Sequence, residues 1–225
     1  MSGAQTIHAG ASLGLPAPWT DQTGTALRRP DGSTAEIGIA SCTWAELQAE
    51  YPNNGAALLA LPAHTMRFVS DWQALFVRNV AGTYWVPVGG VVVLARLGAK
   101  STHTGTTADT VIHSVSIPAG LMTPTSGLRW RCGVIAAANT GMAFIRTKFD
   151  TTQIDSNSVA ASSKYSALTQ YRNVGATNVG AYEFNMSFVA ATTFETSAAF
   201  AVNTVCALNN AADSVVLHSM ELELF

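Results

Sequence analysis

The chain contains 225 residues, of which 48% are hydrophobic and only 12% are charged, and its formal net charge is −2. This length allows one large all-β domain or two smaller domains, with an ample apolar core. Nucleic-acid binding needs several clustered basic contacts, and the only adjacent basic pair is Arg28-Arg29, so that class of function is excluded.

An average soluble domain carries about 25% charged residues, so this chain must cover its surface largely with small neutral side chains. Such surfaces are typical of proteins that contact other protein copies or uncharged sugars. The three cysteines, Cys42, Cys132 and Cys206, are an odd set far apart in the sequence and form no CxxC motif. They predict free thiols, and nothing in the sequence predicts a zinc site or another cofactor.

No apolar run is long enough to span a membrane. The first residues lack the basic region followed by an apolar run that marks a signal peptide. We therefore expect a protein that is made in a cytoplasm and does not insert into a membrane.

Residues 1–40 are rich in Gly, Pro and Thr and contain few large apolar residues. Proline interrupts regular elements, so we predict an extended N-terminal arm that cannot fold without a partner surface. The prolines are Pro16, Pro18 and Pro30. The apolar side chains available for the partner are Leu13, Leu15 and Trp19.

Residues 41–92 predict a small α+β unit. Thr43 and Glu46 have the spacing of a capping box, which predicts a helix over residues 43–51 that ends at Pro52. Short apolar runs of strand length then alternate with turn residues. These runs are AALLAL, TMRFVS, ALFVRN and TYWVPV.

Residues 93–108 include a Thr/Gly-rich stretch and predict a linker. Over residues 109–225 the pattern predicts strands only, about seven or eight of them, with turns between. In the clearest runs, apolar and polar side chains alternate: TVIHSVSI, GLRWRCGVIA and AYEFNMSFVA. The fold class is therefore mainly all-β, with a C-terminal antiparallel β-sandwich of jelly-roll type.

The run SVVLHSMELELF over residues 214–225 predicts the last strand. Its apolar side would hold Val216, His218, Met220, Leu222 and Leu224, and its polar side Ser219, Glu221 and Glu223. Chain ends usually fray, so we expect backbone pairing and burial of the apolar stripe to hold this strand in place.

The run DTVIHSVSIPAGLMTPTSGLRWRCGVIAAANTGMAFIRTKF resembles the distal sandwich domain of bacteriophage tail-fibre and related receptor-binding virion appendage proteins. There, a strand ending in IPAG precedes a glycine turn, an LRW-like strand and a strand ending in a basic residue. The final VVLHSMELELF fits the closing strand of that domain. The stretch from Cys42 to Gly90 resembles the small module that often precedes it.

This resemblance implies a structural protein of the virion, on the tail or the capsid surface. It implies a homotrimer whose N-terminal arm docks on other virion proteins, while the far sandwich contacts a host-surface glycan or protein. The family includes tail-fibre and tail-tip proteins, and a head decoration or head fibre protein remains the alternative. The expected attachment residues are Leu13, Leu15, Trp19, Arg28 and Arg29.

A trimer would bury the terminal strand against sister copies. The expected oligomer-interface residues are His113, His218, Met220 and Phe225. The two histidines fit either a trimer axis, where they could bind a metal, or ordinary hydrogen-bonded positions in a core or interface.

Receptor contacts are expected in the polar stretches 149–165 and 172–182, because loops carry binding residues more often than strands do. Their amides, carboxylates and hydroxyls can hydrogen-bond a sugar while a tyrosine stacks on it, although ordinary solvated loops have the same composition. The candidate residues are Asp150, Asp155, Asn157, Tyr165, Tyr171, Asn178 and Tyr182.

The sequence predicts no enzyme. Its GxSxG run, GASLG at residues 10–14, falls in the predicted extended arm and not at a turn from a strand to a helix, so it is no nucleophile elbow. The sequence contains no GxGxxG after a strand and no GxxxxGK[ST] motif. A carbohydrate-cleaving tailspike would need two carboxylates about 5–9 Å apart. The nearest candidates, Asp150 and Asp155, fall in a stretch that predicts a polar loop.

Overall fold

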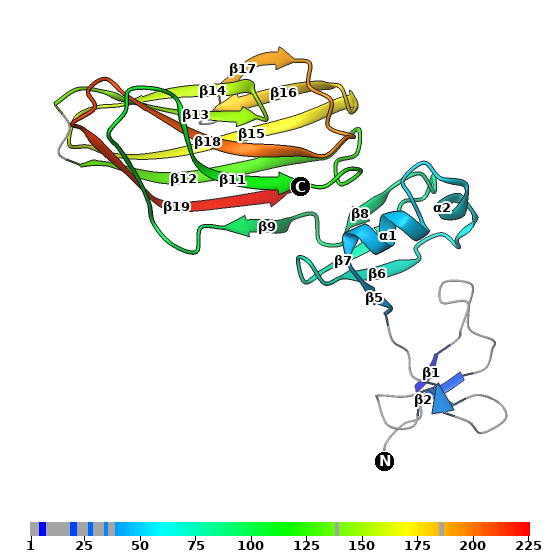
Figure 1. Ribbon diagram of the computed structural model, residues 1–225. Helices are drawn as coiled ribbons and strands as arrows, with labels where there is room; N and C mark the ends of the chain where they lie inside the picture. The colour runs from blue at the N-terminus through cyan, green and yellow to red at the C-terminus, as the bar shows by residue number, and fades with distance from the viewer. Residues whose placement is uncertain are drawn as a thin grey trace. The chain divides into compact units, whose positions relative to one another are not determined.

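The computed structural model describes residues 39–137, 140–184 and 187–225, and the backbone of four short strands between residues 5 and 35. Contacts divide the chain into two compact units, Met1–Val88 and Gly89–Phe225. Most of the elements in Figure 1 are antiparallel strands. The chain is therefore mainly β, as its sequence predicts.

Four short strands near the N-terminus form an antiparallel sheet in chain order. They are β1 (Gln5–Ile7), β2 (Trp19–Asp21), β3 (Leu27–Arg28) and β4 (Thr34–Ala35). This sheet differs from the single extended arm expected for residues 1–40. The prolines fall between the strands in the sequence, so strands of two or three residues can pair without including them.

Helix α1 (Trp44–Glu50) begins at the predicted capping box. The Glu46 amide donates to Thr43 Oγ1 (3.2 Å), and the Thr43 amide donates to Glu46 Oε2 (2.7 Å). These two bonds satisfy amides that a helix start leaves unpaired. The helix buries Trp44 and Leu47 against the core of its unit.

Helix α2 (Ala56–Ala60) occupies the run AALLAL, so the prediction of a strand there is wrong. Ala and Leu favour a helix, and a distant side chain completes the helix end. Arg78 is buried and donates to the carbonyl oxygens of Leu58 (2.9 Å) and Leu59 (3.0 Å). The Leu58 carbonyl oxygen also accepts from the Leu61 amide (3.2 Å), so Arg78 adds a second bond there and supplies a donor for the Leu59 carbonyl at the helix end.

A four-stranded sheet completes the core around these helices. It comprises β5 (Ser41–Cys42), β6 (Met66–Val69), β7 (Ala74–Arg78) and β8 (Trp85–Pro87). The predicted strands in TMRFVS, ALFVRN and TYWVPV correspond to β6, β7 and β8. The Trp44 ring lies 5.8 Å from the Trp72 ring and 5.3 Å from the Phe76 ring. These aromatic contacts join α1 to the sheet.

The second unit is an antiparallel β-sandwich. One sheet has seven strands, with β10, β19, β12, β15, β16 and β17 in that order and β9 also paired with β19. Their bounds are Val92–Arg96 (β9), Ser101–Thr104 (β10), Gly127–Ala137 (β12), Lys164–Ala176 (β15), Val179–Phe184 (β16), Ser187–Thr192 (β17) and Ser214–Leu224 (β19).

The other sheet has four strands in the order β11, β18, β13 and β14. Their bounds are Thr110–Ile117 (β11), Ala143–Phe149 (β13), Thr152–Val159 (β14) and Phe200–Leu208 (β18). The Phe149 ring of β13 lies 5.0 Å from the Tyr171 ring of β15, so the core lies between the two sheets. Phe149 also lies 5.1 Å from Phe200 of β18.

Three segments differ from their predicted structure. Residues 93–108, expected to be a linker, contribute β10 and most of β9, and both strands pair with β19. The stretch 149–165, expected to be a polar loop, contains β14. The run AYEFNMSFVA, expected to be one strand, spans parts of β16 and β17, which pair antiparallel.

Strand β19 is central and pairs with β9, β10 and β12. Its register against β12 shifts at His218: Ser219 pairs with Gly133, and Leu217 pairs with Val134. A bulge of one residue reverses the inward–outward alternation between the parts of the strand before and after it. Val215 and Leu217 are therefore buried, and the predicted inward positions of Val216 and His218 are wrong.

Beyond the bulge, the predicted stripe of Met220, Leu222 and Leu224 is buried. Phe225 closes the strand: its amide donates to the Gly127 carbonyl oxygen (2.9 Å), and its carbonyl oxygen accepts from the Gly127 amide (2.8 Å). Two backbone bonds and the buried stripe thus hold the end of β19 within one chain.

Candidate functional site

An open groove of about 840 Å³ lies on the seven-stranded sheet of the sandwich. Polar side chains from β9, β12, β15 and β19 supply most of its hydrogen-bonding groups. Those residues are Arg96, Arg131, Ser166, His218, Ser219 and Glu221. Ligand sites in proteins commonly have volumes of about 300–1,000 Å³, so this groove can receive a sugar or a short polymer segment.

The bulge and a glycine shape the floor of this groove. Gly133 of β12 lies opposite Ser219, immediately beside the bulge at His218. A Cβ atom at Gly133 would lie 2.6 Å from Ser219 Oγ, so the serine side chain occupies the space that glycine leaves open. The bulge also leaves His218 exposed at the groove wall.

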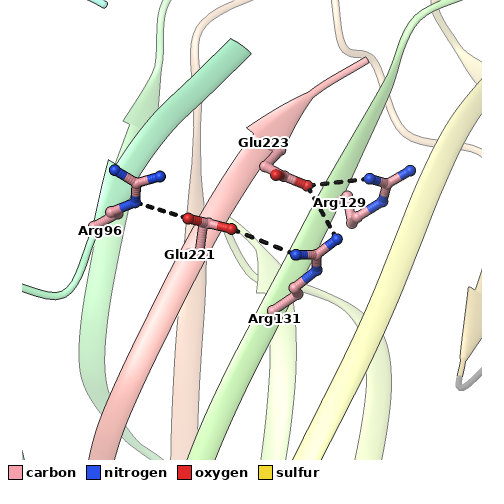
Figure 2. A network of polar contacts seen from close by, with 5 residues as sticks. All are labelled: Arg96, Arg129, Arg131, Glu221 and Glu223. Carbon is pink, nitrogen blue, oxygen red and sulfur yellow. Dashed lines mark hydrogen bonds and ion pairs between the residues drawn. The ribbon is translucent and has the colours of Figure 1, made fainter. Parts of the chain in front are cut away.

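A network of five charged side chains crosses β9, β19 and β12 at this site (Figure 2). Glu221 lies between Arg96 (Nε–Oε2, 2.7 Å) and Arg131 (Nη1–Oε1, 3.6 Å). Glu223 lies between Arg129 (Nη1–Oε2, 3.2 Å) and Arg131 (Nη2–Oε2, 3.7 Å). The pairing of the strands places these residues side by side on one face.

The arginines favour the ionised form of Glu221. The hydrogen bond from Arg96 holds the pKa of Glu221 below its usual value, and the nearby guanidinium charges act in the same direction. Glu221 is therefore ionised at neutral pH. By formal charge, the three arginines and two glutamates of the network leave one excess positive charge.

Arg96 and Arg131 present hydrogen-bond donors to the groove. The Arg131 side chain is 51% exposed and the Arg96 side chain is 68% exposed. Arg131 is too far from both glutamates for a hydrogen bond, so its contacts within the described residues are ion pairs alone. The groove can therefore bind a polar ligand through guanidinium, hydroxyl and imidazole groups.

Two of the expected receptor-binding residues are exposed in turns. Asp150 follows β13 with φ 51°, and its Oδ1 accepts a hydrogen bond from the Ala201 amide (2.8 Å). Asn178 is exposed in the turn between β15 and β16. Neither residue lines the groove.

Asp155 and Tyr171 are buried and have no surface from which to contact a receptor. Asp155 Oδ1 accepts from the Thr147 amide (2.9 Å), and its Oδ2 accepts from the Thr169 hydroxyl. Burial raises the pKa of Asp155, although these hydrogen bonds oppose the shift. The fold thus uses both candidates in the core.

The remaining receptor candidates lie in strands. Asn157 of β14 and Tyr165 of β15 are half-buried. Tyr182 lies in β16, and its side chain falls outside the described residues. The seven candidates therefore do not form one loop cluster, and the groove is built from other residues.

The expected interface histidines lie in different sheets. His113 is half-buried in β11, and burial lowers its pKa. His218 is exposed in β19. Met220 is buried in the core, and Arg129 lies over the Phe225 ring at 5.1 Å. All four side chains thus have defined positions within a single chain.

The expected attachment residues lie at or beyond the limits of the described structure. Trp19 lies in β2 and Arg28 in β3, where the backbone alone is described. Leu13, Leu15 and Arg29 fall outside the described residues.

The three cysteines are free thiols, as predicted. Burial raises the pKa of Cys132 and of Cys206 to about 12, so both stay protonated at neutral pH. Within the described ranges, no group of three or more His, Cys, Asp or Glu side chains has an arrangement that could hold a metal ion. No helix in those ranges is long and apolar enough to cross a membrane.

The sequence pattern placed Arg129, Arg131, Glu221 and Glu223 on the polar faces of their strands but did not bring them together. Arg96, Ser166 and Ser219 carried no binding signal. Charges of opposite sign at alternate positions in two strands were the available clue, since such residues pair across neighbouring strands. That clue needed the β12–β19 pairing, which the sequence does not supply.

Neither a protein-family model nor a curated protein matches the sequence. Among solved structures, sheep galectin-11 in complex with glycerol is 8% identical, with a TM-score of 0.31 over 49% of this chain and 95% of the galectin. A protein of unknown function from Shewanella oneidensis MR-1 is also 8% identical, with a TM-score of 0.31 over 61% of this chain and 79% of the Shewanella protein.

An insecticidal delta-endotoxin from Bacillus thuringiensis is 11% identical, with a TM-score of 0.33 over 88% of this chain and 37% of the toxin. Likenesses this distant carry no inference about the function of the chain.

Proposed function

We propose that the chain is a structural protein of a bacteriophage virion, a tail-fibre or tail-tip protein that binds the host surface through its C-terminal sandwich. The observation that carries this proposal is the open groove of about 840 Å³, lined by polar side chains. The resemblance of residues 43–225 to receptor-binding virion appendage proteins supports the same function.

A groove on the face of a sheet is suited to binding a ligand without catalysing a reaction. Backbone hydrogen bonds between β9, β19, β12 and β15 fix the strands that carry its side chains. Little ordering entropy is then lost when a ligand binds. Hydroxyls of a surface glycan can pair with Ser166, Ser219 and His218, while the arginines supply further donors.

The N-terminal segment is proposed to dock on other virion proteins, and the chain is proposed to assemble as a homotrimer on the particle. Light scattering of the purified protein tests the assembly. We expect a mass near three times 23.6 kDa. A mass of 23.6 kDa at all concentrations would remove the fibre proposal and leave a monomeric binding protein.

The location on the particle separates the two proposed virion roles. Gold-labelled antibody against the sandwich, viewed by electron microscopy on intact particles, is expected to mark the tail tip. Label on the capsid would favour the head decoration or head fibre alternative. Particles without label, from a lysate that contains the protein, would contradict a virion role of either kind.

A further inference from the structure

Positive charge is concentrated on one face of the sandwich. The strands β9, β12, β15 and β19 present five cations and two anions on the outer face of the seven-stranded sheet. The cations are Arg96, Arg129, Arg131, Lys164 and Arg172, and the anions are Glu221 and Glu223. The whole chain has 12 cations and 14 anions, so this face is locally basic in a chain of negative net charge.

The arginines of this face differ in how many of their N–H donors already have an acceptor within the protein. Arg129 donates to Glu223 and lies over the Phe225 ring. Arg96 uses its Nε for Glu221, and no hydrogen bond from its two terminal nitrogens is found among the described residues. Arg131 makes its ion pairs at 3.6 and 3.7 Å, so its guanidinium is held near the groove with its donors open.

Glu221 fixes the positions of both groove arginines. Its two carboxylate oxygens contact Arg96 and Arg131 from neighbouring strands on either side. An arginine guanidinium presents paired N–H groups that match a carboxylate or phosphate. The groove therefore combines pre-positioned cationic donors with the neutral hydroxyls of Ser166 and Ser219.

We propose that the groove binds an anionic saccharide, with the acidic group on Arg131 and Arg96 and the sugar hydroxyls on Ser166 and Ser219. This inference rests on the proposed receptor-binding function and names its ligand class. The shared chemistry is a negatively charged group on a sugar polymer, supplied either by a uronic acid or by a phosphate.

Binding of the purified full chain to an array of bacterial surface polysaccharides tests this inference. The array contains three arms: neutral polymers, uronate-containing capsules and phosphate-containing teichoic acids. Binding confined to the two acidic arms, and weakened by added salt, is the expected result because exposed ionic contacts are screened. The arm that binds identifies the source of the charge.

Variants then assign binding to the groove. Arg131→Gln and Arg96→Gln are each expected to weaken binding of the acidic polymer by about tenfold, since a charge-assisted contact is lost. Lys164→Gln is the matched control, because it removes one exposed charge from the same sheet face outside the groove lining. It is expected to change affinity by less than about twofold. Unchanged melting temperatures would show that all three variants fold.

The outcomes separate the two proposals. Tight binding to neutral polymers, unaffected by Arg131→Gln, would overturn the anionic ligand and leave receptor binding in place. Equal losses in the arginine variants and in Lys164→Gln would also overturn it, because general surface charge would then explain the binding. Binding to no polymer of any arm would overturn the saccharide inference, and binding of the labelled chain to whole cells would then decide whether the receptor-binding proposal stands.

Discussion

At the scale of single residues, Asp155 is a carboxylate inside an apolar core. It is 7% exposed and accepts hydrogen bonds from the Thr147 amide and the Thr169 hydroxyl. These bonds join β14 to β13 in its own sheet and to β15 in the opposite sheet. Burial is the larger influence and raises its pKa above the usual value. The folded state therefore binds this proton more tightly than the unfolded state does.

The stabilising contribution of this raised pKa is present below the unfolded pKa of about 4 and is lost as pH rises through the folded pKa. Asp155→Asn removes the charge and keeps an acceptor for the Thr147 amide. We expect the variant to melt about 2–5 °C above the natural protein at pH 7 and within about 1 °C of it at pH 4. Melting curves by circular dichroism at both pH values check this, and a variant that is less stable at pH 7 contradicts it.

Position 180 in β16 requires glycine because a side chain there would collide with Tyr171, and not because of its backbone angles. A Cβ there would lie 2.1 Å from the Tyr171 hydroxyl and 2.2 Å from Tyr171 Cζ. The Tyr171 ring is buried against Phe149, so it cannot move aside cheaply.

Gly180→Ala is therefore expected to lower the free energy of unfolding by about 1–3 kcal/mol, the usual cost of overpacking. Gly98→Ala is the control, since a Cβ at Gly98 has no neighbour within 4 Å. Urea unfolding measures both changes. Equal urea midpoints for the two variants would show that Tyr171 does not restrict the side chain at position 180.

At the scale of elements, β19 is held by its partners on both sides and by Phe225. The Phe225 ring approaches Gly127 so closely that a Cβ there would lie 2.6 Å from Cζ of the ring. Arg129 covers the ring at 5.1 Å. This contact prevents fraying of the strand that carries Glu221 and Glu223.

We expect Phe225→Ala to lower the free energy of unfolding by about 1–3 kcal/mol through lost burial and the lost arginine contact. Val111→Ala, at a 54% exposed position in β11, serves as the control and should change it by less than about 0.5 kcal/mol. Urea unfolding of both variants gives the comparison. A Phe225→Ala midpoint equal to that of the control would mean that the ring contributes nothing to holding β19.

Elements encoded by local chemistry were predictable, and those that depend on distant partners were not. Helix α1 follows from Thr43 and Glu46, three residues apart, and most sandwich strands follow from alternation. Helix α2 was missed although its Ala and Leu residues favour a helix, because the short apolar run also has strand length, and the Arg78 contact at its end comes from a later strand. The inward face of β19 depends on a bulge against β12, which no pattern within β19 reveals.

The groove was unpredictable for the same reason. Its charged residues come from three strands that are distant in sequence and adjacent in the sheet. The predicted polar loop at 149–165 instead became β14, because its buried Ile154, Asp155 and Val159 face the core. Polar composition therefore indicated a binding surface at a place where the fold needs a strand.

At the scale of the whole molecule, the two units have separate cores. Trp44, Phe76 and Trp85 are buried in the first unit, and Trp130 and Leu222 in the second. We expect a protein comprising residues 89–225 to fold alone, with a single cooperative transition. Calorimetry of this fragment and of the full chain checks the prediction. A fragment without a cooperative transition would show that the sandwich needs the residues before it.

The proposed function requires that the groove of the sandwich, and not another surface, contacts the host cell. Filling the groove without changing its charge isolates that requirement. Ser166→Trp adds bulk on β15 inside the groove, and Ser158→Trp adds the same bulk at an exposed position of β14 in the opposite sheet.

The most direct measurement is flow cytometry of the labelled full chain on a panel of bacterial strains. We expect saturable binding to at least one strain, a loss of about tenfold or more for Ser166→Trp, and no loss for Ser158→Trp. Undiminished binding by Ser166→Trp, or a natural protein that binds no strain, would contradict the account.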